Sequence, residues 1–203
     1  MAMASTKSAR KPGRPRTGVH AAVFAATLST VEEIGYARAT VERIAASAGI
    51  AKTTIYRRWP TKGALIVDCL LDAFGPVPLE GADGVEPSEG AARAELLSST
   101  IRWVAAKIGE PGVGDAFAGV FSDAVSDPAL RVILSERFQD PYRLALQEAL
   151  DEPEHRVLFF IDVVVGALLH RMGMTGEPMV EDDVTALIEM VVPRFVGPRV
   201  RGE

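Results

Sequence analysis

The segment TVERIAASAGIAKTTIYRRWPTKGAL, residues 40–65, constrains the fold of this chain more than any other. Gly49 suits the left-handed position that ends many helices, and Pro60 disfavours helix at the residue before it. These breaks predict one short helix on each side of a Gly-containing turn, the second running from about Lys52 to Trp59. The first of them carries its apolar residues on one face, at Val41, Ile44, Ala45 and Ala48.

The second short helix is predicted to bury one face and to present the other to a partner. Ile55 and Trp59 are four residues apart and supply the buried face. Thr40 and Thr61 are predicted to cap the helices that follow them. The outward face is predicted to present hydrogen-bond donors and cations to a duplex, at Lys52, Thr53, Arg57 and Arg58. Suitable phosphate ligands are Thr40, Thr54, Tyr56 and Lys62.

Charge is distributed unevenly along the chain, whose formal net charge is −5. Residues 1–62 contain 11 Lys and Arg against 3 Asp and Glu, a net charge of +8, and residues 63–203 contain 11 against 24, a net charge of −13. This asymmetry indicates a polyanion-binding end joined to an acidic body. The flexible basic arm predicted over residues 1–16 has two interpretations, a minor-groove contact through GRPR or a solvated tail.

The same segment, with the helix before it, resembles the DNA-binding signature of the tetracycline-repressor (TetR) family of bacterial transcription regulators. The resemblance covers roughly residues 17–70 and includes the opening threonine, IAASAGI, the T-I-Y of the second helix and the aromatic at Trp59. It implies a ligand-responsive homodimer, most simply a repressor, that binds a pseudo-palindromic operator and is released by a small-molecule effector.

The resemblance also assigns roles to single positions. It places Lys52 and Thr53 at base edges, and it places a second group at the backbone or groove edge, namely Arg43, Thr54, Tyr56, Arg57 and Lys62. The family often has serine as the helix cap where this chain has Ala51. Loss of such a cap typically costs about 1 kcal/mol.

Helical periodicity continues to the end of the chain, so the predicted fold class is all-α. The predicted domains are a three-helix helix-turn-helix head over 17–74, a loop over 75–89 with three Gly and three Pro, and a ligand-binding and dimerisation domain over 90–203. In that second domain we expect helices near 90–109, 113–125, 127–150, 154–173 and 180–195. Asp127 and Pro128 have the residue types of a helix start.

The last two predicted helices are assigned to the dimer interface. The helix at 154–173 is apolar nearly all round, so it is expected to be buried on both sides; the alternative is a pair of ordinary core helices in a monomer. The residues expected to face the partner are Val157, Ile161, Val164, Leu168 and Met172 on one helix, with Leu187, Ile188 and Val191 on the other.

A ligand pocket is implied by the family resemblance alone. Its candidate residues are Trp103, Phe117, Phe121, Phe138, Tyr142, Phe159 and Asp162. Aromatic residues at helical spacing are more often core than pocket. Asp162, a carboxylate within an apolar helix, has three interpretations: it orients a ligand, it pairs with an arginine, or it is exposed at an edge.

Other chemistry finds little support in the sequence. The three histidines lack metal-ligand spacing and no catalytic motif is present, so we expect no enzyme activity, no metal and no cofactor. The start of the chain has no apolar core, the one cysteine suits a reducing cytoplasm, and the longest apolar run, Val157–Leu169, is shorter than the about 20 residues that span a bilayer. The competing hypothesis is a helical small-molecule carrier or enzyme with a vestigial basic domain.

Overall fold

The computed structural model describes residues 16–78 and 89–196, and every regular element in that part of the chain is helical. The predicted all-α fold is confirmed. The head comprises α1 (Arg16–Ile34), the short helix η1 (Tyr36–Arg38), α2 (Val41–Ala48), α3 (Lys52–Tyr56) and α4 (Lys62–Phe74). The body comprises α5 (Glu89–Gly109), α6 (Val113–Ser126), α7 (Pro128–Ile133), η2 (Leu134–Gln139), α8 (Asp140–Leu150), α9 (Glu154–Thr175) and α10 (Glu181–Val196). The predicted basic arm, apart from Arg16, and most of the predicted loop lie outside the described residues.

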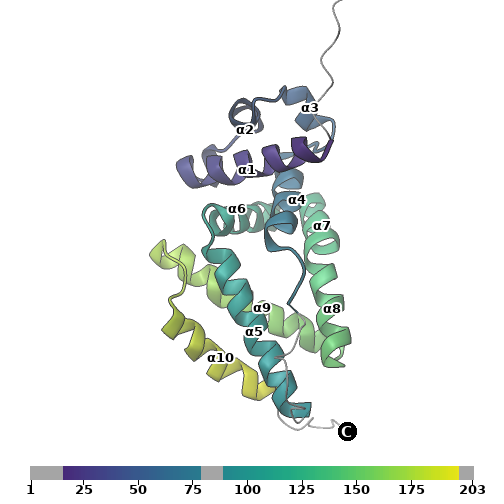
Figure 1. The fold of residues 1–203 in the computed structure, drawn as a ribbon, viewed down its shortest axis with the longest axis vertical. Helices are drawn as coiled ribbons and strands as arrows, with labels where there is room; N and C mark the ends of the chain where they lie inside the picture. Colours follow the sequence, from purple (N-terminus) through teal and green to yellow (C-terminus); the bar gives the residue numbers. More distant parts are fainter. Residues whose placement is uncertain (1–15, 79–88, 197–203) are drawn as a thin grey trace, which may run out of the picture.

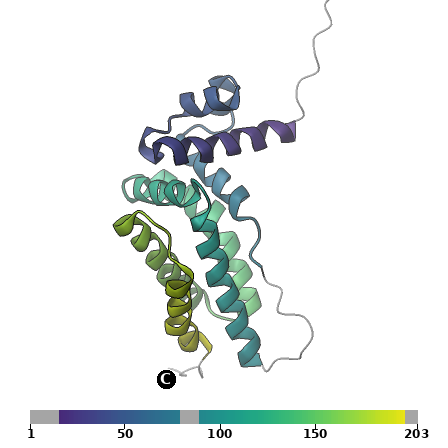
Figure 2. The same ribbon diagram turned by 60° about the vertical axis from the view of Figure 1, so that its left-hand side comes forward.

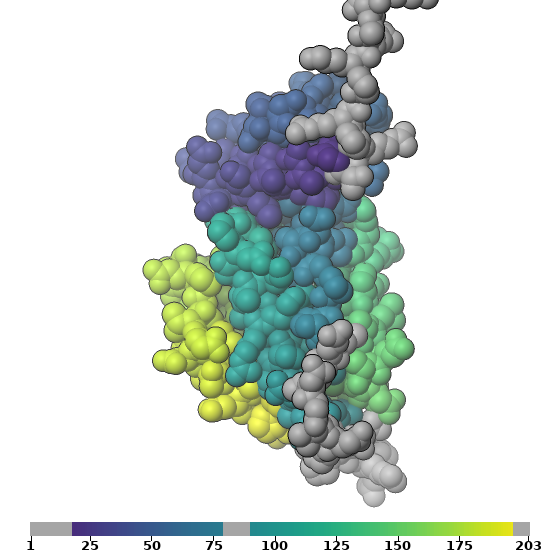
Figure 3. Space-filling model, viewed as in Figure 1, coloured from purple at the N-terminus to yellow at the C-terminus, as the bar shows by residue number. Residues whose placement is uncertain are grey.

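The head is a small helical unit that lies across one end of the body (Figure 1). Side chains from α1, α2, α3 and α4 form a core of their own around Val23, Ile44, Ile55 and Leu65. In the space-filling view α1 rests directly on the body (Figure 3), and α1 contacts α6 there.

Helix α4 belongs to both parts of the molecule. Leu65 packs into the core of the head, whereas Ile66, Leu70 and Phe74 are buried in the core of the body. The helix begins beside the helix-turn-helix and ends inside the body (Figure 1). Any movement of α4 in the body therefore reaches the base of the head.

The body packs its long helices side by side (Figure 2). Helix α10 packs on α5, and α9 contacts α5, α6 and α8. Asp127 caps α7 as predicted, because its Oδ1 accepts hydrogen bonds from the amides of Ala129 at 3.0 Å and Leu130 at 3.1 Å.

Two predicted helix boundaries are wrong. The single helix expected over 127–150 is divided by η2, a π-helical segment, into α7 and α8. A π segment makes i→i+5 hydrogen bonds and commonly marks a functional position in a longer helix. The second short helix ends at Tyr56 rather than at Trp59, although the Trp59 amide still donates to the Ile55 carbonyl at 2.9 Å.

Helix α9 is longer than its apolar run. Its 22 residues make it, within the described residues, the one helix long and apolar enough to cross a membrane by length and composition alone. The apolar run Val157–Leu169 is itself shorter than a bilayer span, but the helix that contains it is not. Its packing nonetheless places Val157, Phe160, Val164 and Leu168 in the core of the body.

Candidate DNA-binding surface and ligand cavity

The helix-turn-helix is built from local signals that the structure shows in detail. Thr40 caps α2, since its Oγ1 accepts from the amide of Arg43 at 3.3 Å. Gly49 ends α2 in the left-handed region with φ 64°, and the amide of Ile50 donates back to the Ala45 carbonyl at 2.9 Å. Ala51 starts α3 without a side-chain cap.

Helix α3 is held to the head by the two predicted anchors. Ile55 and Trp59 are both buried. The Trp59 ring lies 5.4 Å from His20 and 5.7 Å from Phe24, centroid to centroid. Its Nε1 donates to Oδ2 of Asp68 at 2.8 Å. A helix of this length has little stability by itself, so these contacts fix its orientation.

The opposite side of α3 faces solvent and is rich in donors. Glu42 on α2 organises two of them: its Oε1 accepts from the Tyr56 hydroxyl at 3.3 Å and lies 4.0 Å from Nζ of Lys52. Thr54 is half-buried. The predicted DNA ligands that the structure leaves exposed around this surface are Thr40, Arg43, Lys52, Thr53, Tyr56, Arg57 and Arg58.

Lys62 is directed inward, unlike the exposed cations around α3. Its ammonium donates to the Tyr36 carbonyl at 3.1 Å and lies 3.7 Å from the centroid of the Tyr36 ring. The side chain is half-buried. Lys62 therefore ties the start of α4 to η1.

Tyr36 in turn connects η1 to the body. Its hydroxyl donates to Oδ2 of Asp123 on α6 at 2.6 Å. Burial, then the hydrogen bond to Asp123, raises the pKa of Tyr36, so the phenol stays protonated and remains a donor. Gly119 makes room for the ring, because a Cβ there would lie 2.1 Å from it.

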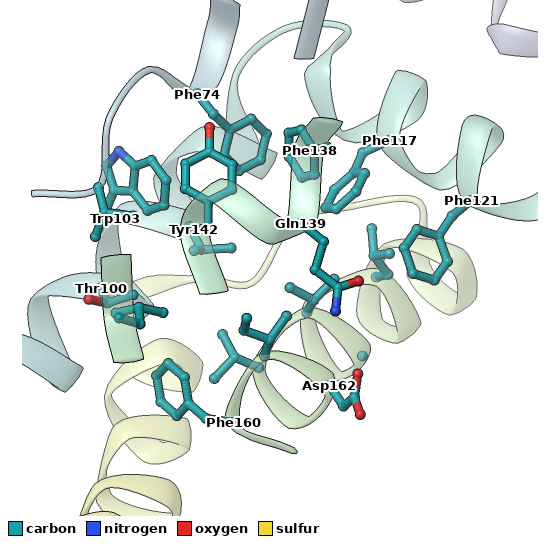
Figure 4. Close-up of a pocket in the computed structure, with 18 of the residues that line it drawn as sticks. Phe74, Thr100, Trp103, Phe117, Phe121, Phe138, Gln139, Tyr142, Phe160 and Asp162 are labelled. Atoms are coloured by element: carbon teal, nitrogen blue, oxygen red, sulfur yellow. The ribbon is translucent and has the colours of Figure 1, made fainter. Parts of the chain in front are cut away.

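The body contains a cavity bordered by α4, α5, α6, η2, α8 and α9 (Figure 4). Its volume, counted as space that the centre of a water molecule can occupy, is about 180 Å³. Phe74, at the end of α4, is the centre of an aromatic cluster on the wall. Its ring centroid lies 5.2–6.3 Å from those of Trp103, Phe117, Phe138 and Tyr142.

Six of the seven pocket candidates line this cavity, and Phe159 does not. The lining includes Trp103, Phe117, Phe121, Phe138, Tyr142 and Asp162. Phe159 points away from it and is 61% exposed, whereas its neighbour Phe160 lies in the wall. One helix position corresponds to a rotation of about 100°, and an all-apolar helix gives no indication of which aromatic faces inward.

Sequence reasoning missed Phe74, Thr100 and Gln139, which also line the cavity. The predicted head, residues 17–74, includes Phe74, whereas α4 in the structure belongs to both parts of the molecule. The position of Phe74 just before Gly75, at the end of a helix that leaves the head, was the available signal. Nothing in the sequence marks Thr100 or Gln139.

Two hydroxyl groups of the cavity wall are already hydrogen-bonded to the protein. The Tyr142 hydroxyl donates to the Gly75 carbonyl at 2.9 Å, and the Thr100 hydroxyl donates to the Leu96 carbonyl at 2.7 Å. Burial raises the pKa of Tyr142 to about 12. Among the described residues, no three His, Cys, Asp or Glu side chains come together as a metal site.

Most of the predicted interface residues are packed inside the protomer. Val157, Val164, Leu168, Ile188 and Val191 are buried in its own core, and Ile161 lines the cavity. Met172 and Leu187 are half-buried. The large apolar side chains that α9 and α10 leave exposed are Phe159 at 61%, Met174 at 72% and Met190 at 75%.

A rigidly anchored short helix with a cationic outer face, carried on a body with an apolar cavity, defines a helix-turn-helix DNA-binding regulator. The family model described as bacterial regulatory proteins, tetR family, matches residues 23–69. The model described as tetracyclin repressor-like, C-terminal domain, matches residues 86–191. The chain belongs to the TetR family.

Individual relatives agree with this assignment. An uncharacterized HTH-type transcriptional regulator of Mycobacterium tuberculosis is 30% identical over 84% of this chain and 84% of its own length. The DNA-binding transcriptional repressor TetR of Mycobacteroides abscessus is 28% identical over 89% of this chain and 95% of its own. A crystallised protein of Mesorhizobium loti assigned to the TetR family superposes with a TM-score of 0.64 at 15% identity, over 90% of this chain and 98% of its own, which shows the shared fold.

Proposed function

We propose that this regulator is a repressor that binds a pseudo-palindromic operator as a homodimer in the cytoplasm, and that a small molecule entering the cavity releases it. The observation that carries the proposal is the position of α4, which supports the helix-turn-helix at one end and lines the cavity with Phe74 at the other. Repression by a relative named as a repressor supports the direction of regulation. The proposal assigns no enzyme activity to the chain.

On the DNA side, α3 enters the major groove and its exposed face meets the bases. Lys52 and Thr53 lie at the start of α3 and are exposed, as expected for recognition-helix residues that contact base edges. Arg43, Arg57 and Arg58 then contact phosphates and fix the register. The contacts of Glu42 with Lys52 and Tyr56 orient these two proposed DNA-contacting side chains before DNA binds.

Dimerisation uses the exposed sides of α9 and α10, which lie next to each other on one side of the body (Figure 2). Phe159, Val163 and Met174 fall on one stripe of α9 at helical spacing, and Met190 adds an exposed apolar side chain on α10. A single head would bind an operator weakly, so two copies are needed to read two half-sites.

Two contacts can pass the state of the cavity to the head. Arg137 lies on η2 directly before the wall residue Phe138, and its Nη2 is 2.5 Å from Oδ1 of Asp68, the residue that accepts from Trp59. On the other side, α6 carries Phe117 and Phe121 in the wall and Asp123 in the bond to Tyr36. A ligand that shifts η2 or α6 thereby favours a head arrangement that no longer matches the half-site spacing, a population shift between two states.

Selection of bound fragments from a random DNA pool tests the proposal. We expect a two-fold symmetric motif, and an affinity that falls steeply with salt. The double variant Lys52→Ala, Thr53→Ala should lose at least about tenfold for the selected site. Arg102→Ala on α5 removes an exposed charge from the body and should leave the affinity unchanged. No sequence preference, with the double variant equal to wild type, would support the carrier or enzyme alternative instead.

A further inference from the structure

The cavity has the size and walls for a flat organic molecule. A water molecule needs roughly 10–15 Å³ of the space counted above, so about 180 Å³ accommodates a molecule of two fused rings. Phe74, Trp103, Phe117, Phe138 and Tyr142 form its inner wall (Figure 4). Ring faces favour both aromatic stacking and cations.

The only charge in the cavity lining, within the described residues, is the carboxylate of Asp162. In the protomer Asp162, Gly166 and Phe121 are exposed and border the cavity mouth, at the edge of the stripe of α9 proposed above for dimerisation. Gly166 follows Asp162 by one helical turn, and a Cβ there would meet nothing within 4 Å, so the space beside the carboxylate is open. Figure 4 shows the amide of Gln139 extending towards the same side of the cavity.

Asp162 has no ion pair or hydrogen bond among the described residues. The arginines of η2 and α8 are engaged elsewhere: Arg137 pairs with Asp68, and Arg143 pairs with Asp140 at 3.1 Å and Glu154 at 3.3 Å. An anionic ligand would therefore lose water without gaining a positive partner, and it would face a carboxylate. A cation would instead be attracted both by the Asp162 carboxylate and by the faces of the aromatic rings.

We propose that the cavity selects an aromatic organic cation of about two fused rings, with the rings among the inner aromatics and the positive charge near Asp162. The inference rests on the proposed response to a small molecule, and it adds that this molecule is positively charged. Asp162 acts here as a specificity-determining residue, because the apolar walls alone accept a neutral molecule of the same shape.

Three probes of one shape and different charge test this proposal: 1-methylquinolinium, 1-methylnaphthalene and 1-naphthoate, titrated calorimetrically into the full chain. We expect the cation to bind most tightly and the anion most weakly. Asp162→Asn should weaken the cation about three- to tenfold, as a partly exposed charge pair permits, and should leave 1-methylnaphthalene within about twofold on the same basis. Asp115→Asn, an exposed site on α6 outside the lining, makes the same change of net charge and should alter neither.

The outcomes separate this inference from the proposed function. If 1-methylnaphthalene binds and weakens DNA binding while 1-methylquinolinium is no tighter, the ligand response stands and the charge preference is overturned. Binding of 1-naphthoate as tight as that of the cation, or an equal effect of Asp162→Asn on all three probes, also overturns it. Failure of all three to bind overturns the proposed ligand class, whereas operator binding is judged by the DNA selection described above.

Discussion

Ala51 is the residue at which the recognition helix is least well supported. Its φ of −64° and ψ of 132° already have the extended geometry of a helix cap, but its side chain accepts no hydrogen bond. Ala51→Ser should add a bond to the amide of Thr53 or Thr54 and stabilise the chain by about 0.5–1 kcal/mol. Urea unfolding measures this gain. Ala46→Ser, at an exposed position inside α2, offers no cap and should give no gain; equal gains at both sites would contradict the explanation.

Gly119 is the residue on which the contact between head and body depends. A methyl group there would overlap the Tyr36 ring, so Gly119→Ala should displace the ring and break its bond to Asp123. Overpacking of this kind costs about 1–3 kcal/mol, which thermal or urea unfolding detects. The control is Gly18→Ala in α1, where a Cβ meets nothing within 4 Å. This change should be neutral or stabilising by up to about 1 kcal/mol, and a loss at both sites would show that helix glycine in general, rather than the Tyr36 contact, is responsible.

At the scale of elements, the link between η2 and α4 is expected to carry part of the ligand signal. Arg137→Gln removes the ion pair with Asp68 while leaving Phe138 in the cavity wall. DNA affinity measured by fluorescence anisotropy without ligand should change less than about threefold, because Arg137 is itself 48% exposed and the glutamine amide can still donate to Asp68, which keeps its bond from Trp59. The drop in affinity caused by a bound ligand, typically about 5–150-fold in coupled systems, should become smaller. Arg171→Gln breaks the pair with Asp183 between α9 and α10 and should leave the coupling intact.

Elements defined by local signals could be predicted, and those defined by packing could not. Thr40, Gly49, Thr61 and Asp127 act within one turn of their own positions, and all four have the predicted role. The π segment at 134–139 has no such local cause in the sequence. Its residues contact α4, and the sequence pattern gives no sign of that contact.

The functional sites show the same difference between features set by local signals and features set by packing. The exposed face of α3 follows from Ile55 and Trp59, because two buried anchors four residues apart determine which residues point outward. Helix α9 is apolar on every side, so its sequence did not reveal that Val157 and Phe160 face inward and Phe159 outward. The contact of Lys62 with Tyr36 could not be predicted either, because the two residues are 26 positions apart.

At the scale of the whole molecule, stability should fall at alkaline pH. Burial raises the pKa of the Cys69 thiol from 9.0 to about 12, and burial raises that of Tyr142 from 10.0 to about 12. Between pH 9 and pH 12, therefore, the unfolded chain releases protons from these two groups that the folded chain retains. The contribution of both groups is therefore complete below pH 9 and is lost as pH rises towards 12. Urea unfolding at intervals across this range should show the decline, and Tyr142→Phe should make it shallower; a flat profile would contradict the burial of these groups.

Assembly is the property of the whole molecule on which operator recognition depends most. The proposed interface uses the exposed Phe159 and Met190 rather than the buried side of α9, so Phe159→Glu should place a charge against the partner's apolar surface and dissociate the dimer. Light scattering after size exclusion should show a monomer with unchanged helix content, and affinity for the two-fold operator should fall. Val132→Glu on α7 makes the same change at another exposed apolar residue, 53% exposed, and should remain dimeric. If Phe159→Glu stays a dimer, these sides of α9 and α10 do not form the interface, and the two heads must be spaced by another surface.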